Sequence, residues 1–167
     1  MAASPPVPRT YTQVYEKAAP SMAALTAYSA GMVSTGTGIV LTADGYIVTN
    51  AHIIAGAEQV NVTLSDDSLW SAQLVGFEPL EDLAVLKIDA SGLTPAQFGD
   101  DTLLRSGDPV SAIGNPMGYR STITPGIVSA LDQPVSVEGT TMYLLQTSAA
   151  INYGSSGGAL LNDRGQV

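Results

Sequence analysis

The sequence contains no cysteine and a single histidine, and both scarcities limit the chemistry that this chain can carry. Without cysteine, the chain has no disulfides, thiolate metal sites, iron–sulfur clusters or cysteine nucleophiles. Because His52 is the single imidazole, acid–base chemistry of that type must run through it, and several histidines cannot share a metal within one chain. We expect neither a metal site nor a cofactor.

Positive charge is also scarce, since six Lys and Arg stand against fifteen Asp and Glu, a net charge of −9. Proteins that bind a phosphate backbone cluster their basic residues, whereas these are scattered, so we expect no nucleic-acid partner. Long uncharged runs occur at 18–43 and 139–162, but glycine interrupts both and proline the first. We therefore expect no stable membrane span in this chain.

Helical periodicity is confined to a short segment near the N-terminus. Residues 1–9 are rich in proline and predict a linker, and Thr10 is placed to cap a helix over 11–18. Beyond it, turn signals separate short β-rich runs, and the pair Asp44-Gly45 between two apolar runs predicts a hairpin. Many short strands without long helical patterns indicate an all-β sandwich or barrel. We expect strands at 22–28, 37–42, 46–50, 59–64, 69–77, 83–88, 109–113, 121–131, 141–147 and 158–161.

The least periodic stretch of the chain, residues 89–108, is expected to connect two lobes. A length of 167 residues suits one domain or two small lobes that share an interface. We divide the chain into an N-terminal barrel with its leading helix at 10–95 and a C-terminal barrel at 96–167, which together make one domain.

Three segments contain the side chains of a serine-nucleophile site: His52 after a β-run, Asp82 before another, and Ser156 between glycines. A serine hydroxyl is a poor nucleophile unless a base takes its proton, and His52 is the candidate base. The imidazole needs an orienting carboxylate on its other nitrogen, for which Asp82 fits, while Glu78 and Glu81 compete with it. The order His, Asp, Ser is the one used by two-barrel serine proteases.

Glycines surround the serine in the segment Gly154-Ser155-Ser156-Gly157-Gly158. Glycine permits a tight turn with unusual φ, so that backbone N–H groups can converge on one point. We expect this turn to expose the Ser156 hydroxyl and to form an oxyanion hole at Gly154, Ser155 and Ser156, with the first and last N–H groups as donors. Each segment alone has an ordinary structural explanation, but their occurrence together and in this order favours catalysis.

With these residues, the sequence from about 35 to 161 resembles the protease domain of the HtrA (Deg) family of chymotrypsin-like serine proteases. The resemblance implies two six-stranded Greek-key β-barrels and a catalytic triad of His52, Asp82 and Ser156. Matching segments outside the serine turn are Asp44–Asn50, Asp82–Lys87, Gly114–Gly118, Thr124–Ala130 and Ala149–Asn152.

The resemblance also implies a function: ATP-independent endopeptidase activity on unfolded or misfolded polypeptides, by acyl-enzyme catalysis, in protein quality control. It implies an extracytoplasmic location, periplasmic or secreted, and leaves open an anchor in a removed N-terminal segment. Members are usually homotrimers, and Tyr11 and Tyr15 lie where such trimers often pack aromatic residues. Ala150 falls where the fold has the floor of its S1 pocket, which predicts aliphatic P1 side chains, and Tyr153 is the second expected substrate-binding residue.

The chain departs from the family pattern in the serine loop and at its C-terminal end. Ser148, Tyr153 and Ser155 stand where the family usually has Asp, Pro and Asn. We expect no PDZ domain and a second barrel that is truncated by two strands compared with the family. A catalytically inactive peptide-binding or scaffold module on this fold, or an inactive fragment that needs its missing strands, is therefore the alternative to a serine endopeptidase.

Overall fold

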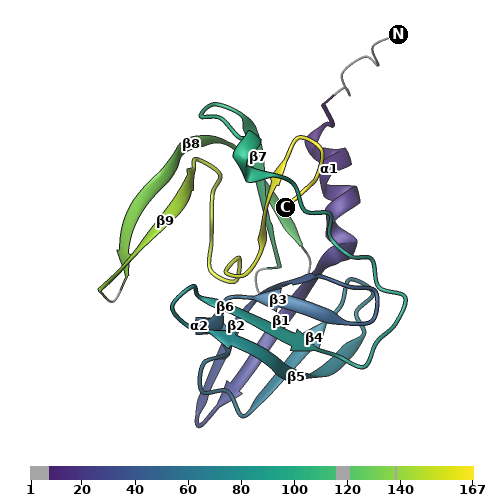
Figure 1. The fold of residues 1–167 in the computed structure, drawn as a ribbon. Coiled ribbons are helices and arrows are strands. Elements are labelled where there is room, and N and C mark those ends of the chain that lie inside the picture. The colour runs from purple at the N-terminus through teal and green to yellow at the C-terminus, as the bar shows by residue number, and fades with distance from the viewer. Residues whose placement is uncertain (1–7, 116–120, 138) are drawn as a thin grey trace.

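The computed structural model describes residues 8–115, 121–137 and 139–167, which form a closed barrel, a second curled sheet and one helix that joins them (Figure 1). The helices are α1 (Tyr11–Ala18) and α2 (Ala51–Ile54), and 3-10 turns lie at η1 (Ala19–Ser21) and η2 (Asp101–Leu103). The strands are β1 (Met22–Ser29), β2 (Met32–Val40), β3 (Tyr46–Thr49), β4 (Gln59–Thr63), β5 (Leu69–Glu78), β6 (Leu83–Lys87), β7 (Pro109–Gly114), β8 (Thr122–Val137), β9 (Thr140–Thr147) and β10 (Ala159–Asn162).

The predicted helix is confirmed as α1, and its first turn is held by a capping box. The Thr10 side chain accepts a hydrogen bond from the Gln13 N–H (3.2 Å), and the Gln13 side chain accepts one from the Thr10 N–H (3.0 Å). These bonds satisfy amides that would otherwise lack partners at a helix start. The α-helix gives way to η1, where Pro20 removes a backbone donor.

The first sheet closes into a six-stranded barrel in the order β1-β2-β3-β6-β5-β4. Burial alternates along β4 and β6, which places Val62 and Leu86 in the barrel core with 0% exposure. The predicted hairpin at Asp44-Gly45 joins β2 to β3, and Gly45 has a φ of +104°, which favours glycine. The expected N-terminal barrel is therefore present.

The second sheet contains four antiparallel strands in the order β10-β7-β8-β9 and curls without closing (Figure 1). It stands where the sequence predicts a truncated second barrel. β8 extends to residue 137, beyond the predicted end at 131, because its pairing with β9 resumes after irregularities between Val128 and Gln133. β2 likewise begins earlier than predicted, at Met32, since pairing with β1 overrides the low strand propensity of Gly36.

Helix α1 joins the two sheets by packing on both. Val14 and Ala18 lie in one buried apolar cluster with Ile39 of the barrel and with Ile113 and Leu161 of the second sheet. Residues 89–108 contain no strand, only η2, so this stretch runs as an irregular connection between the sheets. Within the described ranges, no helix has the length and apolar character needed to cross a membrane.

Candidate active site

Neighbouring strands of the barrel bring His52 and Asp82 together. His52 lies on α2, the single helical turn after β3, and Asp82 directly precedes β6. β3 and β6 are antiparallel partners with Thr49 opposite Ala84, so the end of one lies beside the start of the other. The pairing places both residues at one edge of the barrel.

Both carboxylate oxygens of Asp82 contact His52. One oxygen lies 2.7 Å from the imidazole Nδ1, and the other accepts a hydrogen bond from the His52 backbone N–H at 2.9 Å. Because an ionised carboxylate only accepts hydrogen bonds, Nδ1 carries the proton of this contact. The lone pair of a neutral imidazole is then on Nε2, where it can accept a proton from another group. The pair is open to solvent, since the side chains of His52 and Asp82 are 59% and 35% exposed.

The backbone at Asp82 has an unusual conformation that three hydrogen bonds stabilise. Its φ is +51°, a left-handed value that aspartate tolerates better than most residues. The Asp82 carbonyl accepts hydrogen bonds from the Ala51 N–H (3.1 Å) and the Asn50 side chain (3.0 Å), and its N–H donates to the Pro79 carbonyl (3.3 Å). The residues before His52 therefore hold the carbonyl end of the Asp82 backbone, and the turn after β5 holds its N–H end.

The competing carboxylates are placed differently. The Glu78 side chain accepts a hydrogen bond from the Leu80 N–H at 3.1 Å and so closes the turn between β5 and β6. Within residues 8–115, 121–137 and 139–167, neither Glu78 nor Glu81 forms a hydrogen bond with His52. No group of three or more His, Asp or Glu in those ranges is arranged to hold a metal ion.

The serine turn is shaped by two hydrogen bonds and two left-handed glycines. The Ser155 N–H donates to the Asn152 carbonyl (3.0 Å), and the Gly158 N–H donates to the Ser155 carbonyl (2.8 Å). Because a trans peptide is planar, the second bond directs the Ser156 N–H to the opposite side, away from Gly158. Over the described part of the chain, the N–H groups of Gly154 and Ser156 donate to no protein group, whereas that of Ser155 is engaged.

The serine turn packs against the barrel beside α2, where the yellow segment after β9 descends in Figure 1. A side-chain carbon on Gly157 would lie 3.3 Å from Ile53 and 2.5 Å from the Thr49 hydroxyl, and would overlap the Thr37 carbonyl. Since Ile53 adjoins His52 and Gly157 adjoins Ser156, the turn and α2 are immediate neighbours. Sequence reasoning missed Thr37 and Thr49, and the available signal for Thr37 was its place between two glycines in a β-run.

The residues expected to bind substrate lie around this turn. The Ala150 carbonyl accepts a hydrogen bond from the Thr124 hydroxyl (2.6 Å), and its side chain is exposed. The Tyr153 side chain is 99% exposed. Ser148, one departure from the family pattern, accepts a hydrogen bond from the Ile127 N–H (3.0 Å) and so anchors the segment to β8.

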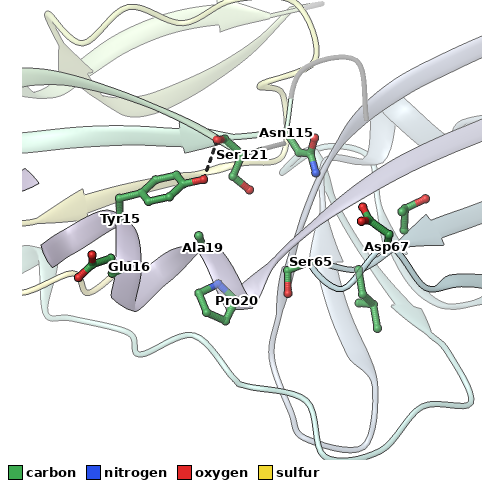
Figure 2. Close-up of a pocket in the computed structure, with 10 residues that line it drawn as sticks. Tyr15, Glu16, Ala19, Pro20, Ser65, Asp67, Asn115 and Ser121 are labelled. Atoms are coloured by element: carbon green, nitrogen blue, oxygen red, sulfur yellow. Dashed lines mark hydrogen bonds between the residues drawn. The ribbon is translucent and has the colours of Figure 1, made fainter. Parts of the chain in front are cut away.

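A cavity of about 460 Å³ lies elsewhere, between α1, the turn after β4 and the end of β7, and none of His52, Asp82 and Ser156 lines it (Figure 2). The Tyr15 side chain lies along one side of this cavity, and its hydroxyl donates a hydrogen bond to the Ser121 carbonyl at 3.0 Å. Asn115 lines another side, and its buried Oδ1 has no hydrogen-bond partner among residues 8–115, 121–137 and 139–167.

Comparison with known proteins places this arrangement in a family. The model of the trypsin-like peptidase domain matches residues 36–167. The chain is 42% identical over 176 residues to serine protease PepD of Mycobacterium tuberculosis, covering 96% of this chain and 38% of that protein. It is 45% identical over 136 residues to "Probable periplasmic serine endoprotease DegP-like" of Chlamydia trachomatis, covering 79% of this chain and 27% of that protein. The chain thus spans well under half the length of these curated relatives.

The fold leads to the same family. The solved structure "HtrA-type protease AlgW with tripeptide" superimposes with a TM-score of 0.89 at 42% identity, covering 95% of this chain and 52% of that chain. This similarity confirms the predicted chymotrypsin-like architecture, with a closed barrel followed by a curled second sheet. By sequence and by fold, the chain belongs to the HtrA (Deg) serine proteases, within the trypsin-like peptidase family.

Proposed function

We propose that this chain is the catalytic domain of a serine endopeptidase that cleaves unfolded or misfolded polypeptides without ATP. The observation that carries the proposal is the His52–Asp82 contact of 2.7 Å, in an HtrA-family chain whose glycine-flanked serine turn packs beside the same helix. His52 is the general base and then the general acid, Asp82 orients it, and Ser156 is the nucleophile. The division into units at 10–95 and 96–167 assigns the base and the nucleophile to different lobes.

The reaction follows from these roles. Nε2 of His52 takes the proton of the Ser156 hydroxyl as its oxygen attacks the scissile carbonyl carbon. The N–H groups of Gly154 and Ser156 stabilise the negative charge that develops on the carbonyl oxygen. The C–N bond then breaks, His52 gives its proton to the leaving amine, and an acyl-enzyme ester remains. Water, deprotonated by His52, attacks this ester, and the released Ser156 oxygen regains the proton as the acid product leaves.

Asp82 contributes orientation and charge rather than proton transfer. Its two contacts with His52 fix the ring and keep the proton on Nδ1, so that Nε2 remains a base. When His52 becomes an imidazolium, the adjacent carboxylate stabilises the positive charge. The solvent exposure of the pair leaves it open to a polypeptide chain.

Substrate binding involves the segment before the serine turn. Ala150 is the floor of a small apolar S1 site for aliphatic P1 side chains, and the exposed ring of Tyr153 packs on substrate next to the scissile bond. Profiling with a peptide library tests this assignment: a preference for Val, Ile or Leu at P1 supports it, and a preference for charged P1 residues contradicts it.

The same proposal includes an extracytoplasmic location and a homotrimer. The location rests on the similarity to the "Probable periplasmic serine endoprotease DegP-like" of Chlamydia trachomatis. The trimer rests on α1, where the Tyr11 side chain is 46% exposed, while the Tyr15 hydroxyl is bound within the chain. Light scattering of the full-length protein tests the oligomer, and a monomeric mass at micromolar concentration contradicts it.

Casein hydrolysis without ATP tests the peptidase itself. The full-length protein is expected to degrade β-casein, and Ser156→Ala to lose at least about a thousandfold in rate because the nucleophile is gone. Ser129→Ala, an exposed serine on β8, is the matched control and keeps the wild-type rate. Equal rates for wild type and Ser156→Ala contradict the proposal, and so does casein binding without hydrolysis by the wild type.

A further inference from the structure

Thr37 is a fully buried polar residue at the point where the barrel, the serine turn and β7 meet. It lies on β2 with 0% exposure. Its hydroxyl donates to the Gly154 carbonyl at 2.8 Å and accepts from the Asn115 N–H at 2.8 Å. A buried hydroxyl is stable when it both donates and accepts, and this one links three segments that are far apart in the chain.

The backbone of Thr37 binds the serine turn as well, at the Ser156 carbonyl. Its N–H donates to the Ser156 carbonyl at 2.8 Å, and its carbonyl accepts from the Thr49 hydroxyl at 2.8 Å. Thr37 therefore binds the carbonyls at both ends of the segment Gly154–Ser156. Because peptide units are planar, fixing these two carbonyls also fixes the planes on either side of the Ser155–Ser156 peptide.

The network reaches the general base through β3. Thr49 is the last residue of β3, and Asn50 and Ala51, which follow it, hold the Asp82 carbonyl. Hydrogen bonds thus link the serine turn through Thr37 to Thr49, and the backbone continues from Thr49 into the segment that presents His52. Catalysis depends on the mutual placement of these groups, and a displacement of about 1 Å costs up to about a hundredfold in rate.

We infer that Thr37 is a positioning residue for the peptidase reaction, whose hydroxyl holds the Gly154 carbonyl and so orients the Ser156 turn toward His52. This inference rests on the proposed function. Thr37 touches neither the reacting atoms nor the substrate, and it acts through the turn. Its hydroxyl is the essential part: an isosteric valine would leave the part-buried Gly154 carbonyl and the buried Asn115 N–H without this partner.

Two substitutions separate positioning from packing. Thr37→Val keeps the shape and removes the hydroxyl, whereas Thr37→Ser keeps the hydroxyl and removes a methyl group. Thr26→Val, on neighbouring β1, makes the same change at a half-buried threonine that forms no side-chain hydrogen bond in the described residues and is the matched control. The readouts are kcat and KM for a fluorogenic peptide, with thermal unfolding of each full-length variant.

We expect kcat of Thr37→Val to fall by about tenfold to a hundredfold at nearly unchanged KM, because the substrate contacts are intact and the turn is misplaced. Thr37→Ser and Thr26→Val are expected to keep kcat near the wild-type value. A folded Thr37→Val with wild-type kcat overturns the inference, as does a Thr37→Ser as slow as Thr37→Val.

The outcomes also distinguish a failure of this inference from a failure of the proposed function. A wild-type protein that is no more active than Ser156→Ala refutes the proposed function, and the positioning role falls with it. An active wild type with unaffected Thr37 variants refutes the positioning role alone. If Thr37→Val does not fold, Thr37→Ser decides the question, since lost kcat in a stable Thr37→Ser overturns the inference and retained kcat supports the hydroxyl's role.

Discussion

Replacing Gly157 by alanine adds one side-chain carbon at the contact between the serine turn and the barrel. Gly157 has a φ of +80°, and an added side-chain carbon would overlap the Thr37 carbonyl and lie 2.5 Å from the Thr49 hydroxyl. Neither neighbour can yield freely, because the Thr49 hydroxyl donates to that same carbonyl. The substitution therefore forces the turn away from the barrel.

The loss in the free energy of unfolding of Gly157→Ala has two parts, and a control variant separates them. A left-handed alanine costs roughly 1–2 kcal/mol, and the loss of the two hydrogen bonds from Thr37 to the turn, its N–H to Ser156 and its hydroxyl to Gly154, adds about 1 kcal/mol each. Gly31→Ala carries the first part alone, since Gly31 has a φ of +77° with nothing within 4 Å of the added carbon. For a domain of this size, each kcal/mol lowers the melting temperature by about 2–4 °C.

Thermal unfolding and casein hydrolysis measure both consequences. We expect Gly157→Ala to melt about 4–8 °C below Gly31→Ala, from the additional 2 kcal/mol or so, and to lose most of its activity. Gly31→Ala is expected to keep the wild-type rate, because Gly31 lies in the hairpin between β1 and β2. Equal melting temperatures and equal rates for the two variants would refute the close approach of the turn to the barrel.

Three further predictions concern other sites. Asp82→Asn should lower kcat for a peptide substrate by about ten-thousandfold, because an amide at this position disfavours the Nδ1 proton; a rate within tenfold of wild type contradicts this. Thr10→Ala should lower the free energy of unfolding by about 1 kcal/mol in urea titrations, since the N-cap of α1 is lost, and an unchanged midpoint contradicts it. The Ser68 side-chain hydrogen bond lowers the pKa of Asp66. Ser68→Ala should raise that pKa in an NMR titration. The bond's contribution to stability is present above the ordinary carboxyl pKa and is lost as pH falls through the lowered value; an unshifted titration contradicts the assignment.

Local signals in the sequence predicted much of the fold. Thr10 marked the start of α1, and Asp44-Gly45 marked the hairpin between β2 and β3, because capping and turn formation depend on residues close in the chain. The start of β2 was predicted too late. Its first half is exposed and contains Gly36, so its strand structure depends on pairing with β1, which local propensity does not report.

The candidate site, too, was predictable from the sequence only in part. Residue type and order identified His52 and Asp82, but three nearby carboxylates remained as partners for the imidazole. The pairing of β3 with β6 and the left-handed backbone of Asp82 decide which carboxylate meets His52. The glycines on either side mark Thr37 in the sequence, but its role could not be predicted, because its partners lie 78 and 117 residues away along the chain.

Labelling with a fluorophosphonate tests the central chemical claim most directly, because this probe reacts with a serine hydroxyl that an adjacent base activates. Peptide mapping by mass spectrometry of the full-length protein should find the adduct on Ser156 in the wild type and none in His52→Ala. Undiminished labelling of Ser156 without the imidazole, or an adduct on another serine, would contradict the account.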